Sequence, residues 1–454
     1  MSEKISLRTR TPEEKISAAL TVNKDAGIYQ CDRSIFTDEE LFELEMEHIF
    51  EGNWVFLAHE SQLANPGDYF TLTIGRQPVM LTRDKNGELN ALINSCSHRG
   101  AMLATRKTGN KSSFTCPFHG WTFSGNGKLL KAKDEKTGGY PPCFKQDGSH
   151  DLRALPGFAN YRGFLFGSLN GNVETLENWL GDTRQVIDLI VDQADQGLEV
   201  LAGTSSYTYE GNWKLQMENG ADGYHVSVVH WNYASTMARR NYEGNATRTV
   251  DANGWSKSTG GVYGFRNGHM LLWTRALNPE VRPIFKQQAR LHEQFGAQRA
   301  DLMVNETRNL CLYPNLYLMD QFSTQLRVVR PLAVDKTEVT IYCFAPKGES
   351  AEDRATRIRQ YEDFFNVSGM GTPDDLEEFR ACQQGFHGRN LPSSDMSRGA
   401  TRWIEGPDDN ANLMGISPLL SGTYSEDEAL YISHHHHWQN TLLNAIRRSK
   451  EAQK

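Results

Sequence analysis

Two short segments limit the fold of this chain more than any other feature of its sequence. The first carries Cys96 and His98 with one residue between them, and the second carries Cys116 and His119 with two residues between them. Such pairs are typical of a metal site, because two turns can close around a metal from opposite sides. Three interpretations compete at this point: a structural zinc site, an iron–sulfur cluster, and four unrelated core residues.

The order of these residues favours a cluster with two irons. Classical zinc fingers pair Cys with Cys and His with His, whereas here each segment supplies one of each. That arrangement suits a [2Fe-2S] cluster of the Rieske type, in which two cysteinates hold one iron and two imidazoles hold the other. Neutral imidazoles raise the reduction potential, so we expect an electron relay. Gly100 and Gly120 would permit close approach of the backbone, and Trp121 would cover the cluster from solvent.

Composition narrows the class of protein. A chain of 454 residues is long enough for two or three domains, and its net charge of −8 without a basic stripe argues against nucleic acid as a partner. No segment approaches the roughly 18 apolar residues of a membrane helix, and the N-terminus lacks an apolar leader, so we expect a cytoplasmic protein. The seven cysteines are too scattered for a disulfide framework. Those outside the two segments are expected to be unreactive and mostly buried, namely Cys31, Cys143, Cys311, Cys343 and Cys382.

Hydrophobic periodicity divides the chain into an arm and two domains. Residues 1–40 are polar, and residues 37–54 have the pattern of an amphipathic helix with Thr37 as N-cap. Alternating strands with an Asn-Gly turn follow in residues 68–96, which predicts an all-β domain over 41–170.

The rest of the chain, 171–454, mixes helices with long strands. The strands 324–334 and 337–346 flank a short turn and are expected to form a hairpin, which predicts an antiparallel sheet, and helices dominate from about residue 350. The expected class is therefore α+β, with an N-terminal all-β [2Fe-2S] domain and a C-terminal domain built on a large antiparallel sheet flanked by helices.

A second candidate metal site lies in residues 212–233. We expect a helix there that presents Asp222, His225 and His230 on one side, with a bulge or irregularity that turns both imidazoles inward. Non-haem Fe(II) oxygenases bind their metal with two His and one carboxylate and leave other positions open. A chain that already carries a redox centre makes iron the favoured metal.

The third ligand must come from another part of the chain. The segment 371–383 offers Asp375, but Thr372 is a plausible N-cap, Pro373 sits at the first helical position, and Asp375 occupies the capping-box position. From spacing alone, helix capping is the favoured interpretation of this carboxylate.

Together these residues resemble a known family. The cluster pattern followed by Asp222, Tyr224, His225 and His230 resembles the large (alpha) subunit of Rieske non-haem iron ring-hydroxylating dioxygenases. The resemblance covers nearly the whole chain and is closest to the benzoate, toluate and 2-halobenzoate 1,2-dioxygenase branch. It is strongest in the segments FEGNWVFLAHESQ, ENGADGYHVSVVHWNYA, NLCLYPNLYLMDQ, YEDFFNVSGMGTPDDLEEFRACQ and DMSRGA.

The resemblance implies a role for each candidate residue. The mononuclear iron would be bound by His225, His230 and the second residue of an Asp-Asp pair, Asp375, with Asp374 as the fallback. Asp222 would hydrogen-bond an iron-ligating His and, across a subunit boundary, a cluster-ligating His, which implies a homotrimer within an α3β3 hexamer. The cluster ligands would be Cys96, His98, Cys116 and His119.

The implied activity is insertion of both oxygen atoms of O2 at carbons 1 and 2 of an aromatic carboxylate. NADH electrons would arrive through a separate flavin and iron–sulfur reductase, since no dinucleotide-binding glycine fingerprint precedes a helix here. They would enter the cluster and pass Asp222 to the iron. Three alternatives stay open: a Rieske monooxygenase or demethylase, an electron-transfer iron–sulfur protein, and a structural zinc protein.

Two features have no assigned function at this stage. An aromatic acid needs a cationic or amide partner, yet the four arginines in strands are expected to be surface or strand-edge charges: Arg275, Arg308, Arg327 and Arg330. Benzoate, alkylbenzoate and halobenzoate differ by a group worth only about 1 to 3 kcal/mol, so the sequence does not rank them. The His434–His437 tract is expected to be a surface feature.

Overall fold

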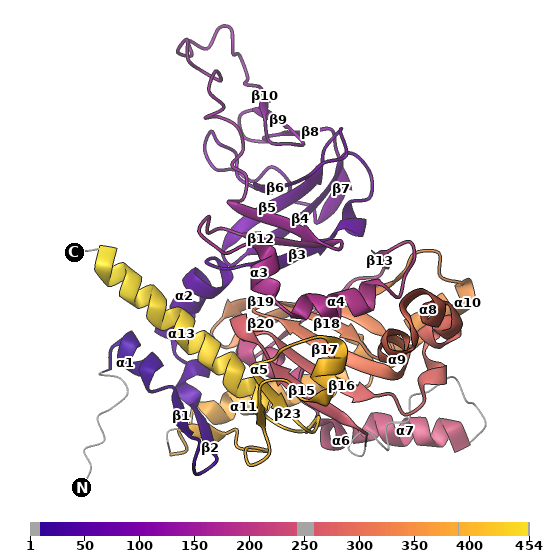
Figure 1. Cartoon of the computed structure of the whole chain (residues 1–454). Coiled ribbons are helices and arrows are strands. Elements are labelled where there is room, and N and C mark those ends of the chain that lie inside the picture. The colour runs from indigo at the N-terminus through magenta and orange to yellow at the C-terminus, as the bar shows by residue number, and fades with distance from the viewer. Residues whose placement is uncertain (1–9, 243–257, 389, 453–454) are drawn as a thin grey trace. The chain divides into compact units, whose positions relative to one another are not determined.

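The computed structural model describes residues 10–242, 258–388 and 390–452, and the chain divides into two compact units (Figure 1). One unit comprises Phe50–Leu176, and the other combines Met1–Ile49 with Glu177–Lys454. These boundaries lie a few residues beyond the expected positions 41 and 170. The polar arm expected over 1–40 is not a separate part, because it groups with the C-terminal unit.

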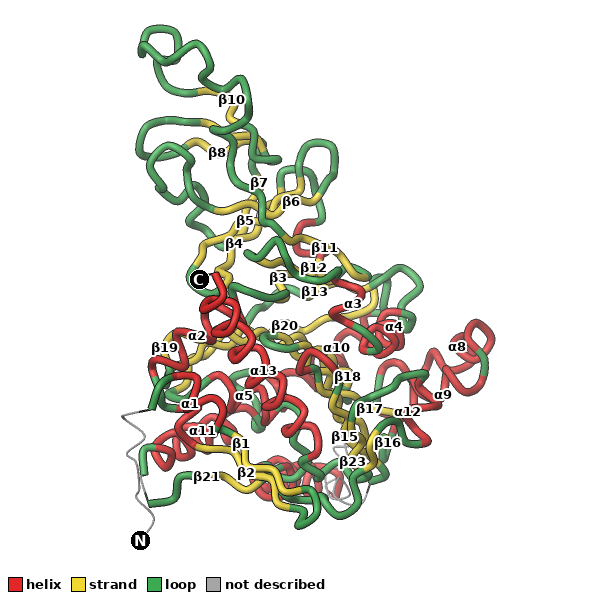
Figure 2. Tube along the Cα trace, turned by 60° about the vertical axis from the view of Figure 1, so that its left-hand side comes forward, coloured by secondary structure: helices red, strands yellow, loops and turns green. Residues whose placement is uncertain are grey.

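The unit Phe50–Leu176 is built from three antiparallel sheets, and Figure 2 shows its strands in yellow joined by long green loops. The strands expected in residues 68–96 are confirmed, with Gly87 at φ +85° in the predicted Asn-Gly turn. The first sheet contains β3 (Val55–His59), β11 (Gly157–Tyr161) and β12 (Phe164–Ser168); the second β4 (Asp68–Ile74), β5 (Gln77–Arg83), β6 (Leu89–Ile93) and β7 (Thr108–Asn110); the third β8 (Ser113–Thr115), β9 (Thr122–Ser124) and β10 (Leu129–Lys131).

The second unit is organised around one large antiparallel sheet. Ten strands of its described residues pair in the order β13-β20-β19-β18-β17-β16-β15-β23-β22, with β14 also on β20. The predicted hairpin is confirmed by the pairing of Ala333 with Lys336. The strands are β13 (Leu198–Val200), β14 (Ser205–Tyr209), β15 (Gly260–Gly264), β16 (Met270–Arg275), β17 (Glu306–Leu312), β18 (Leu316–Asp320), β19 (Thr324–Ala333), β20 (Lys336–Pro346), β22 (Ile404–Glu405) and β23 (Leu420–Gly422).

One face of this sheet is covered by the helices α5 (Trp213–Asn219), α11 (Thr372–Phe386) and α13 (Ala429–Ala452). The Tyr317 hydroxyl donates a hydrogen bond to the carbonyl of Met217 on α5, and the Tyr209 ring lies 5.1 Å from that of Phe379 on α11. Side chains alternate between faces, so residues paired in register with Tyr317 share this face. Arg327 is one of them.

The opposite face carries a buried charge network under further helices. Arg308 forms ion pairs with Glu306 (3.1 Å) and Asp320 (3.4 Å), and Arg282 pairs with Asp320 at 2.9 Å. The expectation that Arg308 is a surface charge is wrong, since its side chain is fully buried. The remaining helices of the second unit include α4 (Thr183–Val191), α8 (Gln288–Phe295), α9 (Ala297–Asn305), α10 (Ala351–Gln360) and α12 (Asp409–Met414).

The N-terminal segment differs from its sequence prediction. The helix expected over 37–54 is α2 (Glu39–Glu45), capped by Asp38 rather than Thr37, and it continues as a π-helical turn, Met46–Phe50. The Asp38 carboxylate accepts hydrogen bonds from two backbone N–H groups at 3.0 and 3.1 Å. A carboxylate is a charged acceptor and forms stronger hydrogen bonds than the hydroxyl of Thr37 would. Before it lie α1 (Pro12–Ser17) and a small sheet of β1 (Leu20–Asn23), β2 (Ile28–Asp32) and β21 (Ser393–Asp395).

The histidine tract is not the surface feature expected from the sequence. It lies within α13, where consecutive side chains point in directions about 100° apart, so a packed helix buries some of them. His434 and His435 are fully buried, and His435 Nε2 lies 2.8 Å from a carboxylate oxygen of Glu218. Burial lowers the pKa of His435 to about 3.

Two other features bear on location and chemistry. No helix among the described residues is both long and apolar enough to cross a membrane. Cys31, Cys311 and Cys343 are buried as expected, whereas Cys143 and Cys382 are exposed.

Candidate active site

The two Cys/His segments fold into matched loops. The carbonyl of Cys96 accepts a hydrogen bond from the N–H of Gly100 at 2.8 Å, and the carbonyl of Cys116 accepts one from Gly120 at 3.0 Å. Both glycines have positive φ, +79° and +72°, which explains why glycine occupies the same place in each loop. The chain thus makes the same ligand-presenting turn twice.

Within these loops, the two cysteines and the two histidines differ in their exposure to solvent. Both thiols are buried, whereas His98 is exposed and His119 is half-buried, with their rings 4.7 Å apart. Trp121 is buried and stacks on the ring of His98 at 4.8 Å. Nδ1 of His119 is buried without a hydrogen-bond partner among the described residues. This donor set fits a cluster with one iron on the thiolates and one on the imidazoles.

The second site lies where the predicted helix breaks. Instead of one helix over 212–233, the chain forms α5, a four-residue helix α6 (Val226–Val229) and α7 (Trp231–Tyr242). The chain packs closely at the first break: a Cβ at Gly223 would lie 2.2 Å from the backbone carbonyl oxygen of Ser425, so only glycine fits there. The breaks leave His225 and His230 immediately before and after α6.

Three potential ligand atoms converge beside this break. Nε2 of His225 lies 3.2 Å from Nε2 of His230, and Oδ1 of Asp375 lies 3.5 and 3.4 Å from these two nitrogens. Ligands about 2.1 Å from one ion and at right angles are about 3.0 Å apart. The near-equal spacings therefore fit one triangular face around a metal, as in 2-His-1-carboxylate iron sites.

The capping interpretation of Asp375 is wrong. Helix α11 has Gly371 at its N-cap without a side-chain hydrogen bond, and the Thr372 hydroxyl instead donates to the carbonyl of Phe365 at 2.9 Å. Asp375 is buried, whereas its neighbour Asp374 is half-buried and lies outside the ligand group. The structure thus brings Asp375 to the two imidazoles.

Two residues orient the ligand group. Oδ2 of Asp222 lies 3.0 Å from Nδ1 of His225, which aims Nε2 at the other ligands. The amide nitrogen of Asn219 lies 3.3 Å from Nε2 of His225 and 3.2 Å from Oδ1 of Asp375. Sequence reasoning missed Asn219, whose only signal is its position at the end of α5, directly before Gly220.

The surroundings shift the pKa values of the two imidazoles in opposite directions. Burial lowers the pKa of His230 to about 4, although the charge of Asp375 opposes this shift. Burial also acts to lower the pKa of His225, but the hydrogen bond to Asp222 and the charges of Asp375 and Asp222 outweigh it, and the pKa is raised.

A cavity opens onto these ligands. Much of its wall is apolar: Phe364 lies 4.9 Å from the ring of His230, and Phe322 stacks on Phe365 at 5.0 Å. Leu272 and Met319 complete an apolar surface on the sheet side. Flat apolar walls beside a few polar groups suit an aromatic molecule.

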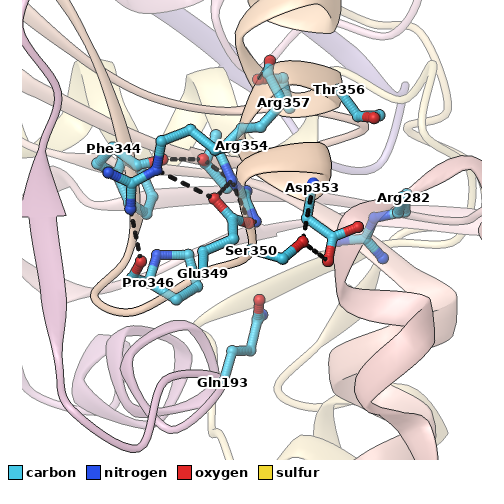
Figure 3. Close-up of polar contacts among 12 residues, drawn as sticks. Gln193, Arg282, Phe344, Pro346, Glu349, Ser350, Asp353, Arg354, Thr356 and Arg357 are labelled. Carbon is cyan, nitrogen blue, oxygen red and sulfur yellow. Dashed lines mark hydrogen bonds and ion pairs between the residues drawn. The ribbon is translucent and has the colours of Figure 1, made fainter.

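A second cavity lies near the end of β20 and the start of α10, and Figure 3 shows the polar contacts beside it. Arg357 donates to Glu349 at 2.5 Å and to the hydroxyl of Thr324 at 3.0 Å, and Arg354 pairs with Glu199 at 2.6 Å. Each of these arginines forms an ion pair with a carboxylate of the protein. Their contacts fasten α10 to the sheet.

Comparisons with known proteins place both sites in families. Residues 53–150 match the Rieske [2Fe-2S] domain, and residues 176–443 match the catalytic domain of the ring hydroxylating alpha subunit. The structure of naphthalene 1,2-dioxygenase from Rhodococcus sp. bound to indole superposes with a TM-score of 0.78 at 25% identity, covering 95% of this chain and 96% of that one.

Curated relatives are similar over almost their full length. The 2-halobenzoate 1,2-dioxygenase large subunit of Burkholderia cepacia is 60% identical, covering 95% of this chain and 93% of the relative. The toluate 1,2-dioxygenase subunit alpha of Pseudomonas putida is 58% identical over 96% of both chains. The expected fold class and the resemblance are confirmed. The chain belongs to the Rieske non-haem iron ring-hydroxylating oxygenases, as a large (alpha) subunit with a [2Fe-2S] cluster and a mononuclear iron.

Proposed function

We propose that this subunit dioxygenates an aromatic carboxylate at carbons 1 and 2. Benzoate, O2, NADH and a proton give the cis-1,2-dihydrodiol of benzoate and NAD⁺. A 2-halobenzoate with the same co-reactants gives catechol, halide, CO2 and NAD⁺, because the first product loses both groups and regains its aromatic ring. The observation that carries this proposal is the convergence of His225, His230 and Asp375 on an apolar cavity in a chain so similar to 2-halobenzoate and toluate dioxygenases.

Each side chain has a distinct part in this proposal. Asp375, His225 and His230 would hold the iron, and that iron would supply the O2 chemistry when bound. Asp222 holds the proton on Nδ1 of His225, so that Nε2 is free to bind metal. The phenylalanines of the cavity position the substrate ring and exclude water around it.

The cluster would be held by one cysteine and one histidine from each loop, and the imidazoles are nearer to solvent than the thiols. Cys96 and Cys116, which are buried, would bind one iron, and His98 and His119, whose rings lie 4.7 Å apart, would bind the other. The imidazoles are then the part of the site that a second subunit can reach.

Asp222 is suited to bridge two subunits. Its side chain is 25% exposed even though one oxygen engages His225, so a cluster-ligating imidazole of a neighbouring copy has access to it. We therefore propose a homotrimer of alpha subunits within an α3β3 hexamer. Electrons come from NADH through a separate flavin and iron–sulfur reductase, in the cytoplasm where NADH is available.

Product formation tests the activity. The purified oxygenase with reductase, NADH and ¹⁸O2 is incubated with benzoate and with 2-chlorobenzoate. Two labelled oxygens in the dihydrodiol or in catechol are expected. A single labelled oxygen would indicate a monooxygenase, and NADH-dependent reduction of the iron centres without an oxygenated acid would refute the substrate class.

A further inference from the structure

We propose that Arg327 binds the substrate carboxylate and thereby sets the specificity of this subunit for aromatic acids. This assignment rests on the proposed function, because it requires an acidic substrate in the cavity beside the iron ligands.

The position of Arg327 follows from sheet register. It lies on β19 opposite Tyr317 of β18, on the face that α5 covers. The same face carries Met319, two residues from Tyr317, and Asn309, which pairs with Met319 in register. All three of Arg327, Met319 and Asn309 line the cavity that holds the iron ligands. The guanidinium is thus part of the cavity wall and not a strand-edge charge.

The guanidinium is buried but unpaired. Arg327 is only 4% exposed, and its Nε has no hydrogen-bond partner among the described residues. No carboxylate of the described chain forms an ion pair with it. A buried guanidinium without an anionic partner is costly, so a bound carboxylate would supply both the missing charge and two parallel acceptors.

The other arginines considered as partners for the acid are all engaged elsewhere. Arg275 pairs with Asp301 at 2.5 Å, and Arg330 pairs with Glu338 at 3.3 Å. Arg308 lies on the opposite face of the sheet within its own charge network. Among these four, Arg327 alone lines the cavity.

The polar groups near Arg327 cannot replace it. The Gln321 amide donates to Asn309 at 2.8 Å, and the Asn309 amide donates to the carbonyl of Gly220 at 2.8 Å. The amide nitrogen of Gln321 is therefore engaged by Asn309, and that of Asn309 by the backbone. Asn219 is engaged with the iron ligands. The carboxylate of the acid is then recognised by Arg327, while the phenylalanine walls receive its ring.

Binding of benzoate and of its neutral isostere benzamide tests the assignment. Affinities are measured by calorimetry on the iron-loaded holoenzyme without O2, for wild type, Arg327→Gln, Arg327→Lys and Arg330→Gln. The last variant is the matched control, because Arg330 lies on the same strand, is 43% exposed in its side chain and faces Glu338. We expect Arg327→Gln to weaken benzoate binding about 10- to 150-fold, as for the loss of a charge-assisted hydrogen bond. Benzamide binding should change little.

The conservative variant separates recognition from folding. Arg327→Lys keeps the charge without the two-pronged donor, so its preference for benzoate over benzamide should lie between those of wild type and Arg327→Gln. A general folding defect would weaken both ligands together and leave the preference unchanged. The assignment of Arg327 is overturned, while the proposed function stands, if Arg327→Gln leaves the preference for benzoate over benzamide unchanged. The same holds if Arg330→Gln weakens benzoate binding as much as Arg327→Gln does. Failure of the wild type to bind benzoate overturns the proposed function as well.

Discussion

Replacement of Asp375 by Asn tests the iron site most directly, because it removes a charge and almost no volume. The carboxylate is 9% exposed in its side chain, and its Oδ1 lies within 3.5 Å of both imidazole nitrogens. The amide oxygen of Asn can still accept the hydrogen bond from Asn219, so the local packing should persist. What disappears is the one anionic member of the three-ligand group.

The expected loss follows from the burial of this carboxylate. Removing one partner of a buried, hydrogen-bonded charge pair costs about 2 to 5 kcal/mol, which is roughly a 30- to 5,000-fold loss of Fe(II) affinity. The assay is anaerobic Fe(II) titration against a competing chelator, with the visible absorbance of the Rieske cluster as an internal measure of intact protein. Asp374→Asn is the matched control, since Asp374 is adjacent in sequence but outside the ligand group. Wild-type Fe(II) affinity in Asp375→Asn, or an equal loss in the control, would refute the ligand assignment.

Three further variants test the surroundings of the site. Asp222→Ala should weaken Fe(II) binding about 10- to 100-fold without changing cluster content, because it frees the imidazole that Asp222 orients; undiminished affinity in the titration would contradict this. Glu45→Gln removes the charged partner of Lys214, whose side chain is fully buried, and should lower the free energy of unfolding by about 3 to 5 kcal/mol. Urea titration measures this loss, and adding Lys214→Met should recover part of it. Gly223→Ala should reduce iron occupancy, since its Cβ would overlap a backbone carbonyl oxygen, whereas Gly385→Ala on α11 has open space and should leave occupancy unchanged in metal analysis.

The parts predicted correctly from the sequence are those set by local spacing. The cluster loops depend on residues within a few positions of one another, such as Cys96 and Gly100, so the pattern is visible in the chain itself. Strand alternation likewise predicted β4, β5 and β6, and the hairpin between β19 and β20, because a half-buried strand repeats every two residues.

The predictions that failed depend on distant packing. Local rules favoured Thr372 as a cap, but its hydroxyl bonds to the carbonyl of Phe365. The irregularity expected in the helix over 212–233 is present, but as full breaks, one of which lies beside the close approach of Ser425 to Gly223. The histidines of α13 were assigned to the surface because sequence does not show that a sheet covers that helix. Asn219 carried no signal, since its role exists only when α11 is placed beside α5.

The distribution of buried charge links the two proposals. In the second unit, Lys214 forms an ion pair with Glu45 and Arg357 forms one with Glu349, so the protein itself balances these charges. The cavity at the ligand group differs, because two imidazoles and a carboxylate converge there and Arg327 lines the same wall without an ion pair to any carboxylate of the described residues. Such a site gains most from binding a divalent metal and an organic anion side by side, which is the combination that dioxygenation of an aromatic acid requires.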